Sequence, residues 1–202
     1  VASPSGQASA SIDTLRVIAF TLLVSYHAIG AGTDSGLEIN YPHPLRFYAD
    51  YLIGIRMPIF AMIAGYVYAL RPVRLQNYSG FFTGKLRRLF IPGVISAVIF
   101  LLISQIMNNA HSKAWSEAWT VVFYSYAHYW YLQTMLVIFL AVGLYDGLLR
   151  GRGTVLLWVF AMTLTLSNLH IGTSFMSLHR VLDLLPHFVT GMLIQRYWPL
   201  FR

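Results

Sequence analysis

Residues 89–107 read LFIPGVISAVIFLLISQIM and contain no charged side chain. A helix needs about 20 consecutive apolar residues to cross the hydrocarbon core of a bilayer, so this stretch is long enough to span it. Hydropathy marks further blocks of the same kind on both sides of it. The expected spans cover residues 15–32, 48–70, 89–107, 129–149, 155–169 and 181–198. We therefore expect an all-α, polytopic transmembrane helical bundle with about six spans.

The composition of the whole chain favours the same class of protein. Of its 202 residues, 57% are hydrophobic and 10% are charged, whereas an average soluble domain has about 25% charged residues. So few charges cannot cover a soluble globule of this size. The chain also has no cysteine, which excludes disulfides, thiolate nucleophiles and cysteine-based metal sites.

The basic residues lie mainly between the expected spans. Although the net charge is +7, this distribution is typical of membrane orientation and makes no case for nucleic-acid binding. The segments 71–88 and 150–152 and the tail from Arg196 hold most of the cations and would face one side. The positive-inside rule places that side, with both termini, in the cytoplasm. Residues 1–11 are expected to form a disordered tail before a membrane domain over 12–202.

The first span contains two ionisable residues, Arg16 and His27, that a helix would place on one face, roughly 16 Å apart. Ionisable residues are costly inside a membrane and usually mark a functional path. A neutral imidazole at mid-membrane depth can take a proton from an alcohol, although a purely structural, hydrogen-bonded histidine fits the periodicity equally well. Asp13 precedes Arg16 by one helical turn, so the two side chains can pair at the start of the helix.

The second span combines Arg56 with Pro58, Gly65 and Tyr66. Pro58 frees a backbone carbonyl and kinks the helix, and Gly65 permits close approach of a neighbouring helix. Packing alone explains the proline and the glycine, but it does not explain an arginine in this position. A kink beside a buried arginine favours a cavity next to Arg56.

The segment after the second span concentrates five cations: Arg71, Arg74, Lys85, Arg87 and Arg88. Arginine forks bind phosphate oxygens in a bidentate manner, so the segment predicts a site for an anionic ligand. Membrane orientation and contact with anionic lipid headgroups are the alternative.

The last span carries a polar face, because His179, Asp183 and His187 recur at helical spacing and Arg180 lies one turn before Asp183. We expect an internal ion-pair network there. No metal site is expected, since neither HExxH nor a similar ligand spacing occurs. The sequence also lacks GxSxG, Walker and GxGxxG motifs, which removes the usual support for hydrolases and nucleotide-driven motors.

These motifs, taken in order, resemble acyltransferase family 3, the integral-membrane O-acyltransferases that modify sugars at the cell surface. Residues 12–28, in which a His follows an Arg about three helical turns later, are similar to the opening signature of that family. RMPIF at 56–60 with AGY at 64–66 resembles its second-helix pattern, although Ala64 stands where the family usually has Ser. RPVR at 71–74 fits its Arg-x-x-Arg, and HYWYL at 128–132 resembles the start of a later span.

The resemblance implies transfer of an acetyl or other acyl group from cytoplasmic acyl-CoA to a hydroxyl of a cell-envelope carbohydrate, in the bacterial cytoplasmic membrane. Acetyl-CoA would be the donor substrate, and no cofactor would be bound permanently. His27 and Arg16 would be catalytic, and Arg71 and Arg74 would hold the donor. Lys85, Arg87 and Arg88 would add charge to the donor site. The residues expected to line a cavity are Asp13, Arg56, Tyr66, Trp130 and Asp183.

The family fold normally has several more spans, so the resemblance also implies that 12–202 is the N-terminal part of the usual domain. Two other hypotheses stay open from the residues alone. In a transporter or flippase-like protein, Arg16, His27, Arg56 and Asp183 would line a permeation path. An inactive, truncated bundle would have only a structural role.

Overall fold

The computed structural model describes residues 4–30, 32, 36–107, 113–124, 126–127, 129–167 and 172–198. Within these ranges the chain is all-helical, as expected, and its one β-type contact is an isolated bridge between Tyr124 and Phe175. The α-helices are α1 (Pro4–Ile29), α2 (Pro44–Leu70), α3 (Tyr78–Lys85), α4 (Ile91–Met107), α5 (Thr120–Phe123), α6 (Trp130–Leu149), α7 (Thr154–Leu166) and α8 (Val181–Tyr197). Short turns are η1 (Leu75–Asn77), the π-helical turn η2 (Leu86–Phe90), η3 (Trp115–Glu117) and η4 (Leu178–Arg180).

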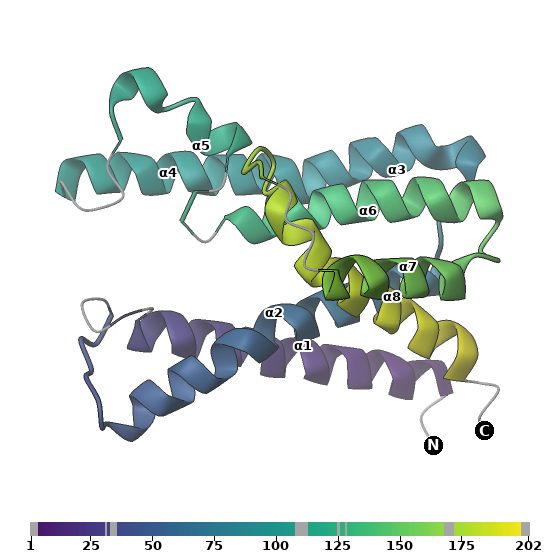
Figure 1. The fold of residues 1–202 in the computed structure, drawn as a ribbon, viewed down its shortest axis with the longest axis horizontal. Coiled ribbons are helices and arrows are strands. Elements are labelled where there is room, and N and C mark those ends of the chain that lie inside the picture. The colour runs from purple at the N-terminus through teal and green to yellow at the C-terminus, as the bar shows by residue number, and fades with distance from the viewer. Residues whose placement is uncertain are drawn as a thin grey trace.

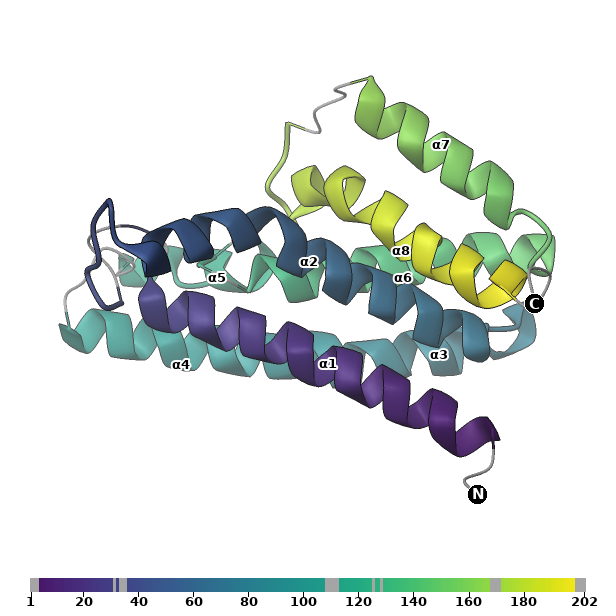
Figure 2. The ribbon, with the colours of Figure 1, turned by 90° about the horizontal axis from the view of Figure 1, so that it is seen from below.

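The long helices run back and forth along one direction (Figures 1 and 2). Figure 2 shows α1 and α2 side by side, with α7 outside α8 and away from the other helices. The first turn of α1, the last turn of α8, the 71–74 connection and the 150–153 turn all lie at the same end of the bundle, which we call the terminal end (Figure 2). The distribution of cations predicts that these segments share a side; their cytoplasmic location stays a prediction.

Two helices of the described part are long and apolar enough to cross a membrane: Leu75–Met107 and Trp130–Leu149. Pro44–Tyr51 and Gly54–Leu70 form a third candidate if the bent pair is a single span. Helix α7 is apolar but shorter. The structure thus contains two to three candidate spans, and the expectation of about six stays a prediction.

Helix boundaries differ from the expected ones at two places. The segment 71–88, expected to be a loop, is extended only up to Arg74, and η1, α3, η2 and α4 then form one long helical stretch. The reason is that Phe81 packs on the core, with its ring 6.1 Å from that of Tyr68 and in contact with Gly143 of α6. Helix α1 begins at Pro4 and so includes most of the segment for which the sequence favours a tail.

Helices α2 and α8 cross at two glycines. A Cβ atom on Gly65 would lie 1.8 Å from the carbonyl oxygen of Phe188, and one on Gly191 would lie 1.9 Å from that of Met62. Each glycine therefore faces the backbone of the other helix at a distance that no side chain permits. The close approach that Gly65 predicts is confirmed. Phe188, at this crossing, belongs to the main hydrophobic core, and its ring centroid lies 5.1 Å from that of Phe139 on α6.

The predicted kink in α2 is also present. The helix bends by 41° between its parts Pro44–Tyr51 and Gly54–Leu70. Pro58 explains this position, because it has no N–H to donate to the carbonyl of Gly54 one turn earlier, and its ring clashes there. The bend lies directly before Arg56.

Candidate functional site

The loop between α1 and α2 is fixed by a buried arginine. Arg46 is 2% exposed, and its Nη1 donates to the carbonyl oxygens of Gly30 at 3.0 Å and Gly32 at 3.2 Å. Its Nε donates to Asp50 at 3.1 Å, and Tyr41 donates to the same carboxylate. This hydrogen bond to Asp50 raises the pKa of the Tyr41 hydroxyl. Arg46 thus caps the carboxyl end of α1 and sets its position relative to α2.

Two of the predicted site residues meet at one aromatic ring beside this cap. Arg56 of α2 is 6% exposed, and its Cζ lies 3.5 Å from the ring centroid of Tyr26 in α1. The imidazole of His27 lies at 78° to the same ring, with 5.6 Å between centroids. His27 itself is on the surface of the chain, in the last turn of α1. The close pairing of α1 and α2 therefore brings the two groups into one neighbourhood.

Asp13 and Arg16 form the expected ion pair on α1, with 3.0 Å between Oδ1 and Nη1. Both side chains are more than half exposed. Helix α1 starts at the terminal end (Figure 2), and Arg16 precedes His27 along this helix, so Arg16 is the nearer of the two to that end. The structure does not bring Arg16 and His27 into contact, because both belong to α1 and lie about three helical turns apart.

The terminal end contains an open pocket of about 610 Å³. Its walls come from the 72–76 segment, from the end of α6 and from the turn after α6. Its cationic residues are Arg74 and Arg150. Arg71, which ends α2, is exposed beside this segment. Of the five cations predicted to hold an anionic ligand, the structure thus places Arg74 in a pocket. It adds Arg150, whose place in a short basic turn indicates only membrane orientation from the sequence.

Asp146, which lines the pocket, belongs to a buried ion pair. Asp146 is 4% exposed and accepts from both guanidinium nitrogens of Arg196, at 2.8 and 2.6 Å. Tyr68 of α2 donates to the same carboxylate at 3.1 Å. Arg196 also donates to Thr154, the first residue of α7. The network therefore ties α2, α6, α7 and α8 together next to the pocket.

The other three predicted cations lie along the helical stretch after the pocket. The ammonium of Lys85 lies 3.3 Å from the ring centroid of Phe139, in a cation–π contact within the core. Arg87 and Arg88 are exposed on the π-helical turn η2. These side chains do not line the pocket.

The remaining predicted residues lie on α2, α6 and α8. Arg180 joins two of them, with its Cζ 5.4 Å from the ring centroid of Trp130 and its Nη1 3.6 Å from Asp183. This ion pair is about half exposed, so it lies at the surface of the chain and not in the interior where a network was expected. Tyr66 is half-buried on α2, where its backbone nitrogen approaches Gly191.

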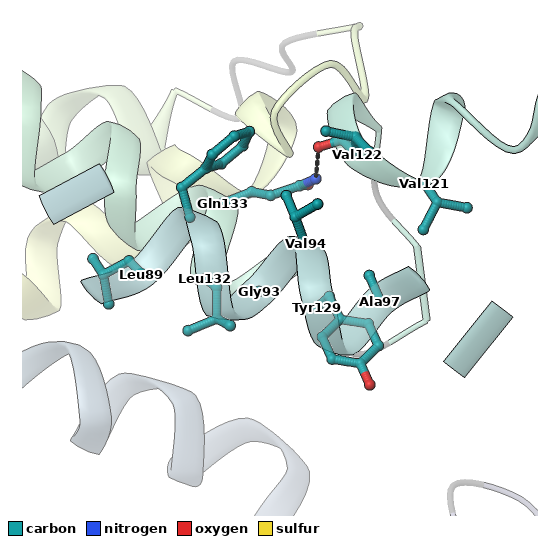
Figure 3. A pocket seen from close by; sticks show the side chains of 10 residues that line it. Leu89, Gly93, Val94, Ala97, Val121, Val122, Tyr129, Leu132 and Gln133 are labelled. Atoms are coloured by element: carbon teal, nitrogen blue, oxygen red, sulfur yellow. Dashed lines mark hydrogen bonds between the residues drawn. The ribbon is translucent and has the colours of Figure 1, made fainter. Parts of the chain in front are cut away.

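An uncharged residue, Gln133, anchors the segments at the start of α6. Its side-chain nitrogen donates to the carbonyl oxygen of Val122 at 3.0 Å (Figure 3). The same nitrogen donates to the carbonyl oxygen of Tyr124 at 3.3 Å. Its oxygen accepts from Ser177 at 2.6 Å. One side chain thereby fastens the segments before α6 and before α8. His128, part of the motif that precedes α6, lies outside the described residues.

The fold and these sites define a helical membrane protein with a cationic pocket at one end and, in its helices, a buried arginine and a histidine that contact the same tyrosine ring. Comparison with protein families matches residues 9–202 to the acyltransferase domain of acyltransferase family 3. The chain belongs to this family of membrane acyltransferases. Neither the comparison with curated proteins nor the comparison with solved structures gives a match.

Proposed function

We propose that this protein is a membrane-embedded O-acyltransferase that moves an acetyl group from cytoplasmic acetyl-CoA to a hydroxyl of a cell-envelope carbohydrate. The observation that carries the proposal is the terminal-end pocket. It has a volume of about 610 Å³, within the range of small-molecule sites. Its two arginines supply forks for phosphate oxygens, which coenzyme A presents at its nucleotide end.

The histidine and the pocket occupy different depths of the bundle. Arg56 and Arg71 belong to one helix, and the rise of that helix separates them by about 22 Å. Coenzyme A has its phosphates at one end of a long flexible arm and its thioester at the other. Such a donor can be held at the pocket while its acyl group reaches towards His27. The carbohydrate then approaches from the opposite side of the membrane.

Replacement of the two pocket arginines tests the donor site. We expect Arg74→Ala with Arg150→Ala to weaken acetyl-CoA binding by roughly tenfold or more, because each exposed guanidinium–phosphate contact contributes about 1 kcal/mol. The measurement is calorimetric titration of acetyl-CoA into the purified chain in nanodiscs.

Arg152→Ala is the matched control, since Arg152 lies in the same turn as Arg150 but does not line the pocket. If the double variant binds acetyl-CoA as tightly as Arg152→Ala does, the pocket is not the donor site. Movement of a solute into liposomes without acetyl-CoA would instead favour a transporter.

A further inference from the structure

Arg56 differs from the other buried or paired arginines in having no acidic partner among the described residues. Arg16, Arg46, Arg180 and Arg196 each form an ion pair with an aspartate. Arg56 is 6% exposed, yet its Nε and Nη1 have no hydrogen-bond partner in the described part of the chain. Buried charged donors that stay unpaired destabilise a fold, so such a group calls for an explanation.

The surroundings of Arg56 hold its guanidinium in place without using these two nitrogens. The group stacks on Tyr26, with 3.5 Å between Cζ and the ring centroid. The face of an aromatic ring attracts a cation but leaves the in-plane N–H groups free to donate. The 41° bend of α2, between Tyr51 and Gly54, lies just before Arg56. Nε and Nη1 thus have no hydrogen-bond partner among the described residues, although neighbouring atoms cover both of them.

The position of Arg56 relates it to the predicted base. Tyr26 carries the guanidinium on its face, and His27 is the next residue, with 5.6 Å between the two ring centroids. Arg46 fixes the end of α1 through the carbonyl of Gly30, at 3.0 Å, and so limits movement of His27 relative to α2. A donor of two N–H groups and an imidazole are therefore held by the same pair of helices.

We propose that Arg56 is a further catalytic residue, whose Nε–H and Nη1–H bind the carbonyl oxygen of the acyl group; this inference rests on the proposed acyl transfer. The acceptor hydroxyl attacks the thioester carbon, its proton passes to His27, and the carbonyl electron pair moves onto oxygen. Arg56 stabilises this oxyanion. When the pair returns, the carbon–sulfur bond breaks, and the coenzyme A thiolate takes the proton from His27. The products are the O-acyl ester and free coenzyme A.

Arg56→Met separates a catalytic role from a structural one. Methionine fills a similar volume without charge, so we expect the thermal unfolding temperature of the purified chain to stay the same or rise. At the same time kcat for acyl transfer should fall by about 100-fold or more, because the oxyanion loses its donors. The KM for acetyl-CoA should change by less than about threefold, since the interaction is made mainly in the transition state.

The matched control is Arg180→Met, because Arg180 also lies over an aromatic ring but is half exposed and has Asp183 as its partner. It should leave kcat unchanged. A fall in the unfolding temperature of Arg56→Met would show a structural arginine and overturn the inference. An unchanged kcat of Arg56→Met would also overturn the inference. A raised KM at unchanged kcat would do the same, because it would show that Arg56 binds the ground state and the transition state equally. If the wild-type chain transfers no acyl group, the proposed function itself fails.

Discussion

We expect His27→Ala to lower kcat for acyl transfer by about 10²–10⁴-fold. The expectation follows from the role of a general base, since an unassisted hydroxyl attacks a thioester slowly. Because His27 lies on the surface of the chain at the end of α1, its removal should hardly change stability. The measurement is release of the coenzyme A thiol from acetyl-CoA by the chain in nanodiscs, in the presence of an oligosaccharide acceptor.

A second histidine provides the control for this experiment. His43 accepts a hydrogen bond from the backbone nitrogen of Leu45 at the start of α2, and asparagine can replace it in that cap. His43→Asn should therefore transfer acyl groups at the wild-type rate. Transfer by His27→Ala at that same rate would remove His27 from the mechanism.

Gly65→Leu should unfold or severely destabilise the bundle. Even its Cβ would lie 1.8 Å from the carbonyl oxygen of Phe188, so α2 and α8 would have to separate and expose the core between them. We expect a loss of about 3 kcal/mol or more in the free energy of unfolding. Thermal unfolding of the purified chain in detergent, followed by size-exclusion chromatography, gives the measurement.

Gly80→Leu is the matched control, because a Cβ on Gly80 meets no atom within 4 Å. Leucine is a better helix former than glycine, so the free energy of unfolding should stay the same or rise by up to about 1 kcal/mol. Equal stability of Gly65→Leu and Gly80→Leu would contradict the close packing of α2 on α8.

Local sequence patterns were sufficient to predict the helices and several of their details. Apolar runs gave the extents of α2, α6 and α8 to within a few residues, and Pro58 and Gly65 predicted a kink and a close approach. The pairing of Asp13 with Arg16 also followed from spacing. Each of these features depends on neighbours along one helix, which is the information that periodicity carries.

Features that join distant segments could not be predicted in this way. Asp146 and Arg196 belong to different helices, and the local sequence around each residue does not predict the other as its partner. Arg150 lies in a turn whose charge fits membrane orientation equally well, so only the folded chain shows that it shares a pocket with Arg74. Similarly, the helical extension before residue 89 depends on packing of Phe81 against Tyr68.

The ion pair between Asp146 and Arg196 has a consequence for synthesis of the protein. Domains and helices emerge from the ribosome in order from the amino terminus, and Arg196 is in the last helix of the described chain. The wall around Asp146 can be clamped only after α8 has inserted and met α6 and α7. A nascent chain would therefore complete the wall of the terminal-end pocket last, when its final described helix is in place.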